Sequence, residues 1–338
     1  MSINKYLIIF FVFLPAVTSS ILNSEEKETV YNYLPIDKKL TTAIESSDFL
    51  TNKESYCRKR KNLNDVTWFE DFSTHTLNKA DWNYSLSNGF FDNGLFVYGW
   101  GNGELQYYRE PMKNSQSYTN DNLFIEDGLL KIQPIYHQKP YKKNFDFTSA
   151  RINTKGLRSF TFPSRITICF KVPTGIGAWP AIWLMPQSNI SWPKGGEIDI
   201  MESRGRVTNI VGSALHFGNS FFDKATLVND VVIPPSVSFQ EKFHSITFEW
   251  KKDSIKMYLD SETLPYMSIS NEQEDFKEYG YPFGSVYYLI VNVAVGGKYD
   301  DYKIDKQAFC KNNDCTNKDN PDQHRLLIDW IEYARIDN

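Results

Sequence analysis

The stretch Gly195–Gly205, GGEIDIMESRG, combines an apolar strand pattern with three carboxylic acids. Apolar residues alternate with Glu197 and Asp199, which is the period-two pattern of a half-buried strand. In a regular strand Glu197 and Asp199 share one face, whereas Glu202, five positions after Glu197, points to the opposite face. A β-bulge between Asp199 and Glu202 would absorb one residue and bring the three acids together. The stretch therefore predicts a bulged strand in a β-sheet.

Glu197 and Glu202 are suited to cleaving a glycosidic bond, because one carboxylate can attack while the other acid protonates the leaving oxygen. Four effective strand steps of about 3.3 Å and two side chains of about 4 Å place the carboxyl groups roughly 5 Å apart. This separation predicts a retaining mechanism, since inversion needs about 6.5–9.5 Å. The alternative is an ordinary amphipathic strand whose acids face water.

The residues before this strand favour the catalytic interpretation. Trp179 and Trp183 in GAWPAIWLMP lie four positions apart, so in an extended segment both face one side. Together they would form a wall on which sugar rings can stack. The alternative for both tryptophans is packing in the core. Gly195 and Gly196 allow the backbone to bend sharply before the acids.

Short β-rich runs, separated by Gly, Asn, Asp and Pro, continue along most of the chain, and long helical periodicity is almost absent. The runs are GLLKIQPI, RITICFKV, WPAIWLM, EIDIME, FHSITFEW, SIKMYLD, VYYLIVNVAV and LLIDWIEYARI. FHSITFEW and SIKMYLD flank KKD and predict a hairpin. The pattern predicts an all-β sandwich of antiparallel strands, forming one domain over residues 62–338.

Composition excludes several classes of partner. The chain has 338 residues, of which 41% are hydrophobic and 15% aromatic, so it can bury a large core. Its formal net charge of −4 provides no basic surface for nucleic acid or for a membrane. We expect a monomer with a core or a binding surface rich in aromatic rings.

The N-terminus predicts secretion. Lys5 precedes the apolar run Tyr6–Val17 and small residues follow, so residues 1–20 are interpreted as a signal peptide. The competing interpretation is a membrane anchor, but about a dozen apolar residues are fewer than the roughly 20 that span a bilayer. Asn83 and Asn189 are then candidate glycosylation sites.

Residues 21–61 form a polar lead segment that ends in Arg58-Lys59-Arg60-Lys61. This basic run is predicted to be a solvated turn, with a processing site as the alternative. The lead segment as a whole is too short to be a separate carbohydrate-binding module.

Four cysteines in a secreted chain make disulfides plausible. Cys310 and Cys315 enclose four residues and are the first choice for a pair. Cys169 lies within a predicted strand, where it is either a buried thiol or the partner of Cys57. No second close Cys/His pair accompanies these cysteines, which argues against a zinc site.

Taken together, these motifs resemble glycoside hydrolase family 16, in particular its laminarinase-like branch of β-1,3-glucanases with the related animal β-glucan recognition proteins. The resemblance covers most of residues 66–338. Besides GGEIDIMESRG, its blocks are WGNGELQYYRE (100–110), DGLLKIQPI (127–135), FTSARINTKG (147–156), RITICFKVPTGIGAWPAIWLMP (165–186), SALHFG (213–218), FHSITFEW (243–250), YYLIVNVAVGG (287–297) and LLIDWIEYARI (326–336).

The resemblance implies a β-jelly roll of two curved antiparallel sheets with a concave, aromatic-lined cleft. It makes Glu197 the nucleophile, Glu202 the general acid/base, and Asp199 a partner that holds a proton or hydrogen bond between them. Repulsion among three close acids agrees with this, because it favours a protonated Glu202 beside an ionised Glu197. No cofactor or catalytic metal is required; a structural calcium on the convex face is known in the family, but no ligands are assigned to it.

The same resemblance adds further residues to the expected substrate-binding cleft. They are Trp179, Trp183, Arg151, Asn102 and His216. A surface ion pair is the alternative role for Arg151. A role in the turn alone is the alternative for Asn102, and a purely structural role is the alternative for His216.

Three features depart from the family pattern. Phe217 and Cys169 stand where relatives often have Trp and Arg, and either change could reshape a subsite. Residues 298–325 replace a segment that is rich in Trp in many relatives, and are expected to border one end of the cleft.

The sequence thus favours a secreted, endo-acting, retaining β-1,3-glucanase that binds laminarin or the glucan of fungal or algal walls. The alternative from another class is a non-catalytic β-1,3-glucan recognition protein of innate immunity. Because all three acids are present, the hydrolase is the preferred interpretation. A third reading is an enzyme that acts on another polysaccharide, such as mixed-linkage glucan or a galactan.

Overall fold

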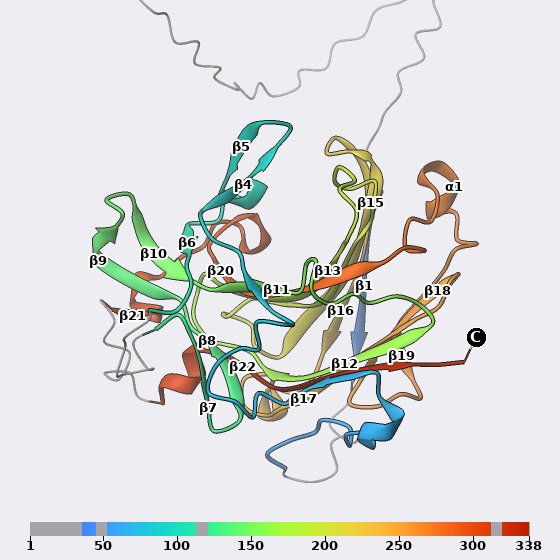
Figure 1. Cartoon of the computed structure of the whole chain (residues 1–338), viewed down its shortest axis with the longest axis horizontal. Helices are drawn as coiled ribbons and strands as arrows, with labels where there is room; N and C mark the ends of the chain where they lie inside the picture. Colours follow the sequence, from blue (N-terminus) through green and yellow to red (C-terminus); the bar gives the residue numbers. More distant parts are fainter. Residues whose placement is uncertain (1–35, 45–52, 113–120, 312–319, 338) are drawn as a thin grey trace, which may run out of the picture. The chain divides into compact units, whose positions relative to one another are not determined.

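The structure, a computed structural model, describes residues 36–44, 53–112, 121–311 and 320–337. Two eight-stranded sheets pack face to face, accompanied by two smaller sheets (Figure 1). The predicted all-β sandwich is therefore confirmed. Within the described ranges the α-helical structure is the short helix α1 (Asp275–Tyr279). Pro35–Asn338 form one compact unit, so the folded unit extends to the N-terminal side of residue 62.

The first large sheet carries the acidic strand. Its strands, in spatial order, are β1 (Ile36–Ala43), β16 (Asp223–Val232), β15 (Ile210–Ser220), β14 (Glu197–Ser203), β13 (Ala178–Pro186), β20 (Tyr287–Val295), β11 (Arg151–Asn153) and β3 (Asn83–Tyr84). The pairs from β16 to β3 are antiparallel, whereas the edge strand β1 runs parallel to β16.

The second large sheet covers one face of the first. Its order is β19 (Pro265–Ser270), β18 (Ser254–Leu259), β17 (His244–Trp250), β12 (Ser164–Lys171), β22 (Leu326–Arg335), β8 (Leu129–Ile132) and β7 (Leu123–Glu126), with β2 (Trp68–Glu70) also paired to β22. The predicted hairpin is confirmed, because β17 and β18 pair antiparallel from Ile246–Leu259 to Trp250–Ile255.

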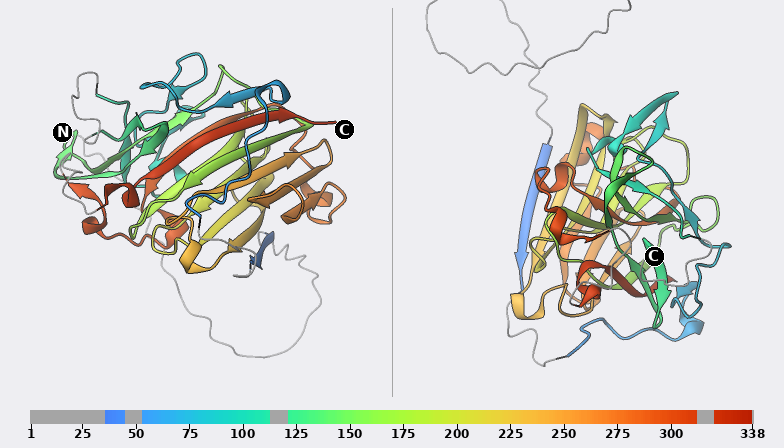
Figure 2. Two further views of the ribbon diagram at one scale, coloured as in Figure 1. Left: turned by 90° about the horizontal axis from the view of Figure 1, so that it is seen from below. Right: turned by 90° about the vertical axis from the view of Figure 1, so that its left-hand side faces the viewer.

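Two small sheets flank the sandwich. One contains β21 (Cys310–Lys311), β9 (Ile135–Tyr141), β10 (Phe145–Ser149) and β6 (Gln106–Tyr108), and the other is the hairpin of β4 (Gly89–Asp92) and β5 (Leu95–Tyr98). The β4–β5 hairpin projects from the body of the fold, on the same side as the turn between β15 and β16 (Figures 1 and 2).

Alternation along β13 shows how the core and the site share one strand. Ile182 and Leu184 are fully buried in the main hydrophobic cluster between the sheets. Trp179 and Trp183 occupy the odd positions, so their side chains lie on the opposite, half-buried face. The strand therefore packs the sandwich with one face and presents two indole rings with the other.

The end of the lead segment, at Cys57 and Arg58, is fastened to the second large sheet. Cys57 forms a disulfide with Cys169 on β12, so Cys169 is the partner of Cys57 and not a buried free thiol. The prediction of a solvated basic turn is wrong for Arg58, whose side chain is only 9% exposed. Its guanidinium pairs with Glu332 and lies 5.4 Å from the ring centroid of Trp330. The physical reason is that Glu332 and Glu262 neutralise the guanidinium, which offsets the cost of burying it.

Several other expectations concern residues that the structure does not describe. The proposed signal peptide, residues 1–20, lies outside the described residues, as does Cys315 of the expected Cys310–Cys315 pair. In the portion of the chain that is described, no helix has the length and apolar character needed to cross a bilayer. Asn83 and Asn189 are both exposed, and their glycosylation remains a prediction.

Candidate active site

The acidic strand β14 is bulged at the predicted place. Asp199 pairs with Ala214 of β15 and Glu202 with Gly212, so three steps on β14 oppose two on β15. The other neighbour, β13, shows the same shift. The two residues inside the bulge, Ile200 and Met201, both contribute to the core cluster. The bulge is thus confirmed, and it returns Glu202 to the face of Glu197 and Asp199.

Each glutamate accepts a hydrogen bond from a tryptophan. Trp192, in the β13–β14 loop, donates its Nε1–H to Glu197 Oε2 at 2.7 Å. Trp179 donates its Nε1–H to Glu202 Oε1 at 2.8 Å. The two indole nitrogens thus hold the carboxyl groups of Glu197 and Glu202, and Asp199 lies between these two residues in the chain.

The three acids are buried close together, which disfavours ionisation of all three at once. Burial, followed by the charge of Asp199, raises the pKa of Glu202 to about 8 and that of Glu197 to about 7. Burial also raises the pKa of Asp199 to about 7, and a hydrogen bond with Glu197 opposes that rise. Burial thus favours the protonated form of Glu202 at neutral pH. This is the property that a general acid needs near neutral pH.

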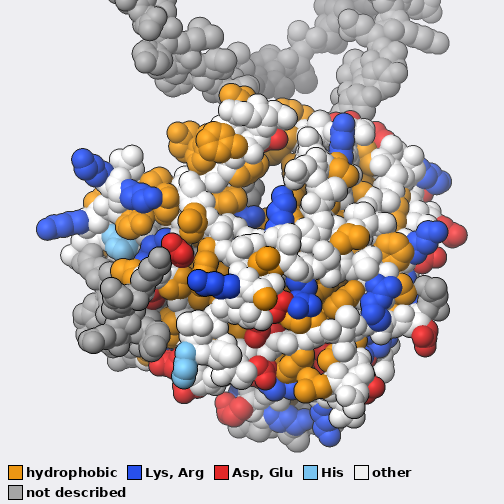
Figure 3. Space-filling model, viewed as in Figure 1, with side chains coloured by type: hydrophobic (Ala, Val, Ile, Leu, Met, Phe, Trp, Pro, Cys, Tyr) orange, Lys and Arg blue, Asp and Glu red, His pale blue; other side chains and the backbone are white. Residues whose placement is uncertain are grey.

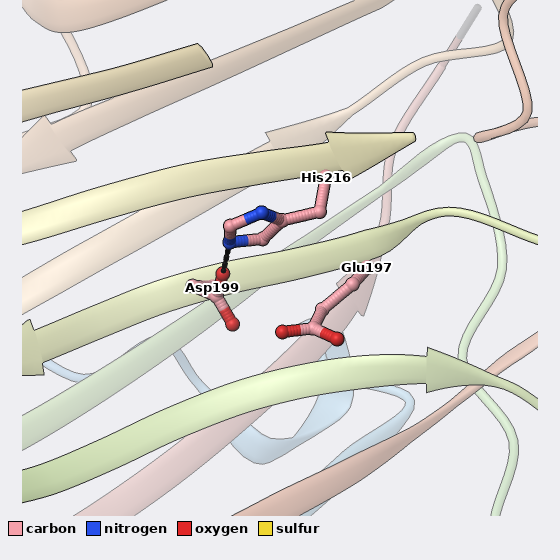
Figure 4. A group of neighbouring side chains, drawn as sticks. All are labelled: Glu197, Asp199 and His216. Carbon is pink, nitrogen blue, oxygen red and sulfur yellow. Dashed lines mark ion pairs between the residues drawn. The ribbon is translucent and has the colours of Figure 1, made fainter. Parts of the chain in front are cut away.

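His216 on β15 lies beside the central aspartate. Its Nε2 lies 3.0 Å from Asp199 Oδ2, at ion-pair distance but without the alignment of a good hydrogen bond (Figure 4). Its Nδ1 is 3.1 Å from Thr226 Oγ1, which fixes the ring. Glu197, Asp199 and His216 offer ligand atoms within 4.8 Å of one another, a spacing that a cation could also use. No calcium site is assigned, and the expected structural calcium stays a prediction.

Arg151 lies between two indole rings and not in a surface ion pair. Its Cζ is 4.0 Å from the ring centroid of Trp100 and 4.7 Å from that of Trp183. In the register of the sheet, Arg151 is opposite Asn292, which accepts a 2.8 Å hydrogen bond from Trp183 Nε1. Arg151, Asn292, Ala181 and Glu202 consequently form one row across four strands.

The turn that holds Asn102 is fixed by a buried acid. Glu104 is buried and accepts hydrogen bonds from Gln106 at 2.6 Å and from Tyr108 at 3.2 Å. Asn102 itself is exposed, and its side chain lies 3.4 Å from Glu104 Oε1. Burial raises the pKa of Glu104, and the Arg151 charge and these hydrogen bonds oppose the rise. Asn102 is thus an exposed residue whose amide nitrogen donates to the buried Glu104.

Four residues of the site were missed by the sequence reasoning: Trp100, Trp192, Asn292 and Tyr299. Tyr299 stacks on Trp179 with a centroid separation of 5.0 Å and an interplanar angle of 13°. It belongs to the segment 298–325, whose first residues therefore border the site as expected. Of the four, Trp192 was the easiest to predict from sequence, because it lies five residues before Glu197 in a Trp-Pro pair. Asn292 could not be found from sequence because only strand pairing places it there.

The β15–β16 turn forms a wall on the Glu197 side. Phe221 in this turn lies 5.8 Å from the ring of Trp192, and Lys298 Nζ is 5.6 Å from the ring of Phe221.

The suggestion that Phe217 and Cys169 reshape a subsite is wrong. Phe217 is fully buried and packs on Phe276 in the core. Cys169 lies on the other sheet, in its disulfide.

Comparison with known proteins gives consistent results. The model of the family "Glycosyl hydrolases family 16" matches residues 107–331. The chain is 31% identical over 245 residues to glucan endo-1,3-beta-glucosidase A1 of Niallia circulans, covering 70% of this chain and 34% of that protein. The chain thus spans about a third of the length of this relative.

Two other similarities bear on function. A beta-1,3-glucan-binding protein of Penaeus monodon is 33% identical over 175 residues, covering 44% of this chain and 47% of that protein. The X-ray structure of an endo-beta-1,3-glucanase from Pyrococcus furiosus aligns with a TM-score of 0.65 at 28% identity, covering 81% of this chain and 95% of that one. The extent of the family match, together with the bulged acidic strand in a two-sheet sandwich, shows that the chain belongs to glycosyl hydrolases family 16.

Proposed function

We propose that the protein is a secreted, endo-acting β-1,3-glucanase that hydrolyses its substrate with retention of configuration. The observation that carries the proposal is the bulge, which brings Glu197, Asp199 and Glu202 to one face beside indole rings. Similarity to endo-1,3-glucanases supports the choice of linkage. The predicted signal peptide supports secretion.

In the first step, Glu197 attacks the anomeric carbon and forms a glycosyl ester, while Glu202 transfers its proton to the departing glycosidic oxygen. In the second step, the ionised Glu202 removes a proton from water, and the resulting hydroxide attacks the anomeric carbon and releases Glu197. Asp199 and His216 lie close to the nucleophile and have opposite effects on its pKa: the charge of Asp199 raises the pKa of Glu197, and His216 lowers it. Both steps are substitutions with proton transfer, so no residue has to donate or accept electrons in a redox step.

The aromatic rings would bind the glucan. Trp179 and Trp183 are half-buried on the same side of β13 as the acids, and sugar rings stack on the faces of such indole rings. Arg151 and Asn102 would donate hydrogen bonds to sugar hydroxyl groups, and Arg151 is already held between the rings of Trp100 and Trp183.

The second candidate is a β-1,3-glucan recognition protein without activity, which the similarity to the binding protein of Penaeus monodon supports. The presence of all three acids on one face, with the pKa of Glu202 raised by burial, favours the hydrolase. A binder has no need to keep three mutually repelling carboxyl groups in a buried cluster.

The test is release of reducing sugar from laminarin and, in parallel, from lichenan. We expect the wild type to cleave laminarin and Glu197→Ser to be inactive while still binding it. Proton NMR of the first product should show the β-anomer. Binding of laminarin without cleavage by the wild type would establish the recognition protein, and an active Glu197→Ser variant would refute the mechanism. Preference for lichenan would point to mixed-linkage glucan.

A further inference from the structure

A pocket lies near the end of the acidic strand β14. Its volume is about 470 Å³, within the range of pockets that bind small ligands. Its charged and aromatic lining comes from four separate parts of the chain, namely Lys39, Arg204, Arg206, Asp230, Tyr299 and Asp301. Apart from Tyr299, none of these residues belongs to the site described above.

The register of the sheet places this pocket on the face that carries the three acids. Gly212 on β15 is opposite Glu202, and Asp230 on β16 is opposite Gly212. Directly opposite residues share a face, so the Asp230 side chain lies on the face of Glu202, two strands away. A Cβ atom added to Gly212 would come to 2.9 Å from Asp230 Oδ1 and 3.4 Å from the Tyr299 hydroxyl. Both groups thus lie directly over Gly212, the neighbour of Glu202.

Tyr299 connects the pocket with the expected general acid. Its ring stacks on Trp179, whose Nε1–H donates to Glu202. Arg204 contacts the same ring, with its Cζ 4.0 Å from the centroid, and its Nε donates a 2.9 Å hydrogen bond to the Tyr299 carbonyl oxygen. A single ring therefore separates the pocket from the Trp179–Glu202 pair.

The charges in the pocket are paired. Lys39 Nζ lies 2.7 Å from Asp230 Oδ2, and Arg206 Nε lies 2.6 Å from Oδ1 of the buried Asp300. Arg204 and Arg206 make their hydrogen bonds through Nε, so their terminal NH₂ groups can donate to a ligand. Paired ions with spare donors suit the hydroxyl groups of a neutral sugar better than an anion.

The wider surface gives no support for an anionic ligand. On the face shown in Figure 3, basic and acidic side chains are scattered among hydrophobic and uncharged groups. The whole chain has a formal net charge of −4. A polyanionic chain would be favoured by a continuous basic track, so an uncharged polysaccharide is the favoured class of ligand.

We propose that this pocket binds a glucose unit of an uncharged β-glucan on the leaving-group side of the scissile bond, and that Lys39 of the lead segment completes it. The inference rests on the proposed function. A general acid contacts the leaving oxygen, so a pocket beside Glu202 is placed to hold the departing part of the chain. Strand β1, which carries Lys39, pairs with β16 at the edge of the sheet (Figure 2) and lies outside residues 107–331 of the family match.

The test compares two substrates in the wild type and in Lys39→Met. Methionine keeps an unbranched apolar stem and removes the donor. Laminarin has sugar units on both sides of the scissile bond, whereas an aryl β-laminaribioside has only the aryl group on the leaving side. We expect the KM for laminarin to rise roughly tenfold, as loss of one hydrogen bond from a charged donor would give. The kcat/KM for the aryl substrate should change by less than about twofold.

Two further variants separate binding from folding. Lys39→Arg keeps the charge and the donors and should retain the low KM for laminarin. Lys306→Met is the matched control, because Lys306 pairs with Asp146 at the same 2.7 Å and is 47% exposed, against 53% for Lys39. It should leave the kinetics on both substrates unchanged.

Four results would overturn the proposal. They are an unchanged KM for laminarin in Lys39→Met, an equal loss on both substrates, a loss in Lys39→Arg as large as in Lys39→Met, and a wild type that prefers carboxymethylated laminarin to laminarin. Failure of the wild type to cleave either substrate would instead refute the proposed hydrolase. Calorimetry of laminarin binding would then test the pocket by itself, and equal affinities of the wild type and Lys39→Met would overturn it.

Discussion

Trp192 donates its indole N–H to the carboxyl group of Glu197 across a 2.7 Å hydrogen bond. The interaction favours the charged form of Glu197 and opposes the effects of burial and of Asp199 on its pKa. A residue from the loop before the strand thereby helps to keep the expected nucleophile ionised.

Replacing Trp192 with Phe should therefore raise the pKa of Glu197. The acid limb of the kcat/KM profile for laminarin should move to higher pH, because the nucleophile must be ionised to attack. The measurement is initial rate from pH 4 to pH 9. Trp330→Phe on the other sheet is the matched control and should leave the limb in place. An unmoved limb in Trp192→Phe would contradict this role.

Replacing Glu202 with Gln removes the proton that the leaving oxygen needs. We expect a loss of about 10²–10⁴-fold on laminarin, the usual contribution of general acid catalysis. An aryl β-glucoside oligomer with an acidic phenol should lose far less in its first step, since that leaving group departs without a proton. Wild-type activity on laminarin should fall as pH rises through about 8, the pKa of Glu202. Equal losses on both substrates would argue against the assignment.

Glu202→Gln, which should lower activity, should raise the stability of the fold at high pH. The folded-state pKa of Glu202 lies above its ordinary value of 4.5, so the protonated acid stabilises the fold at low pH, and this contribution is lost as pH rises through about 8. Glutamine does not titrate. Glu202→Gln should thus be more stable than the wild type by about 1–3 kcal/mol at pH 9 and nearly equal to it at pH 5. Urea unfolding at the two pH values measures the difference, and a gain that is the same at both would be inconsistent with titration of this acid.

The Cys57–Cys169 disulfide joins residues that are 112 positions apart. Closing so long a loop restricts the unfolded chain, so Cys57→Ser should lower the free energy of unfolding by about 2–4 kcal/mol. Denaturant unfolding without reductant measures the loss. Activity at 25 °C should persist, because the disulfide lies on the sheet that does not carry the acids. An unchanged unfolding midpoint would refute a stabilising role.

The parts that sequence predicted well are those with a local pattern. Alternation fixed the strand character of β13 and β14, and the odd spacing between Asp199 and Glu202 required the bulge that the structure contains. The parts it missed depend on pairing between distant strands. Nothing near Asn292 in the chain indicates that it faces Arg151 and Trp183, because these residues meet only when β11, β13 and β20 align. Arg58 was misjudged for a similar reason, since its acidic partner Glu332 is 274 positions away.

The attachment of the lead segment has a consequence for proteolysis. The basic run continues from Arg58 through exposed Lys59 and Arg60, where a trypsin-like protease can cut. Such a cut would not release the piece before it. Cys57 would remain bonded to Cys169, and β1 would remain paired with β16. The product would be a two-chain protein that separates on a denaturing gel only after reduction.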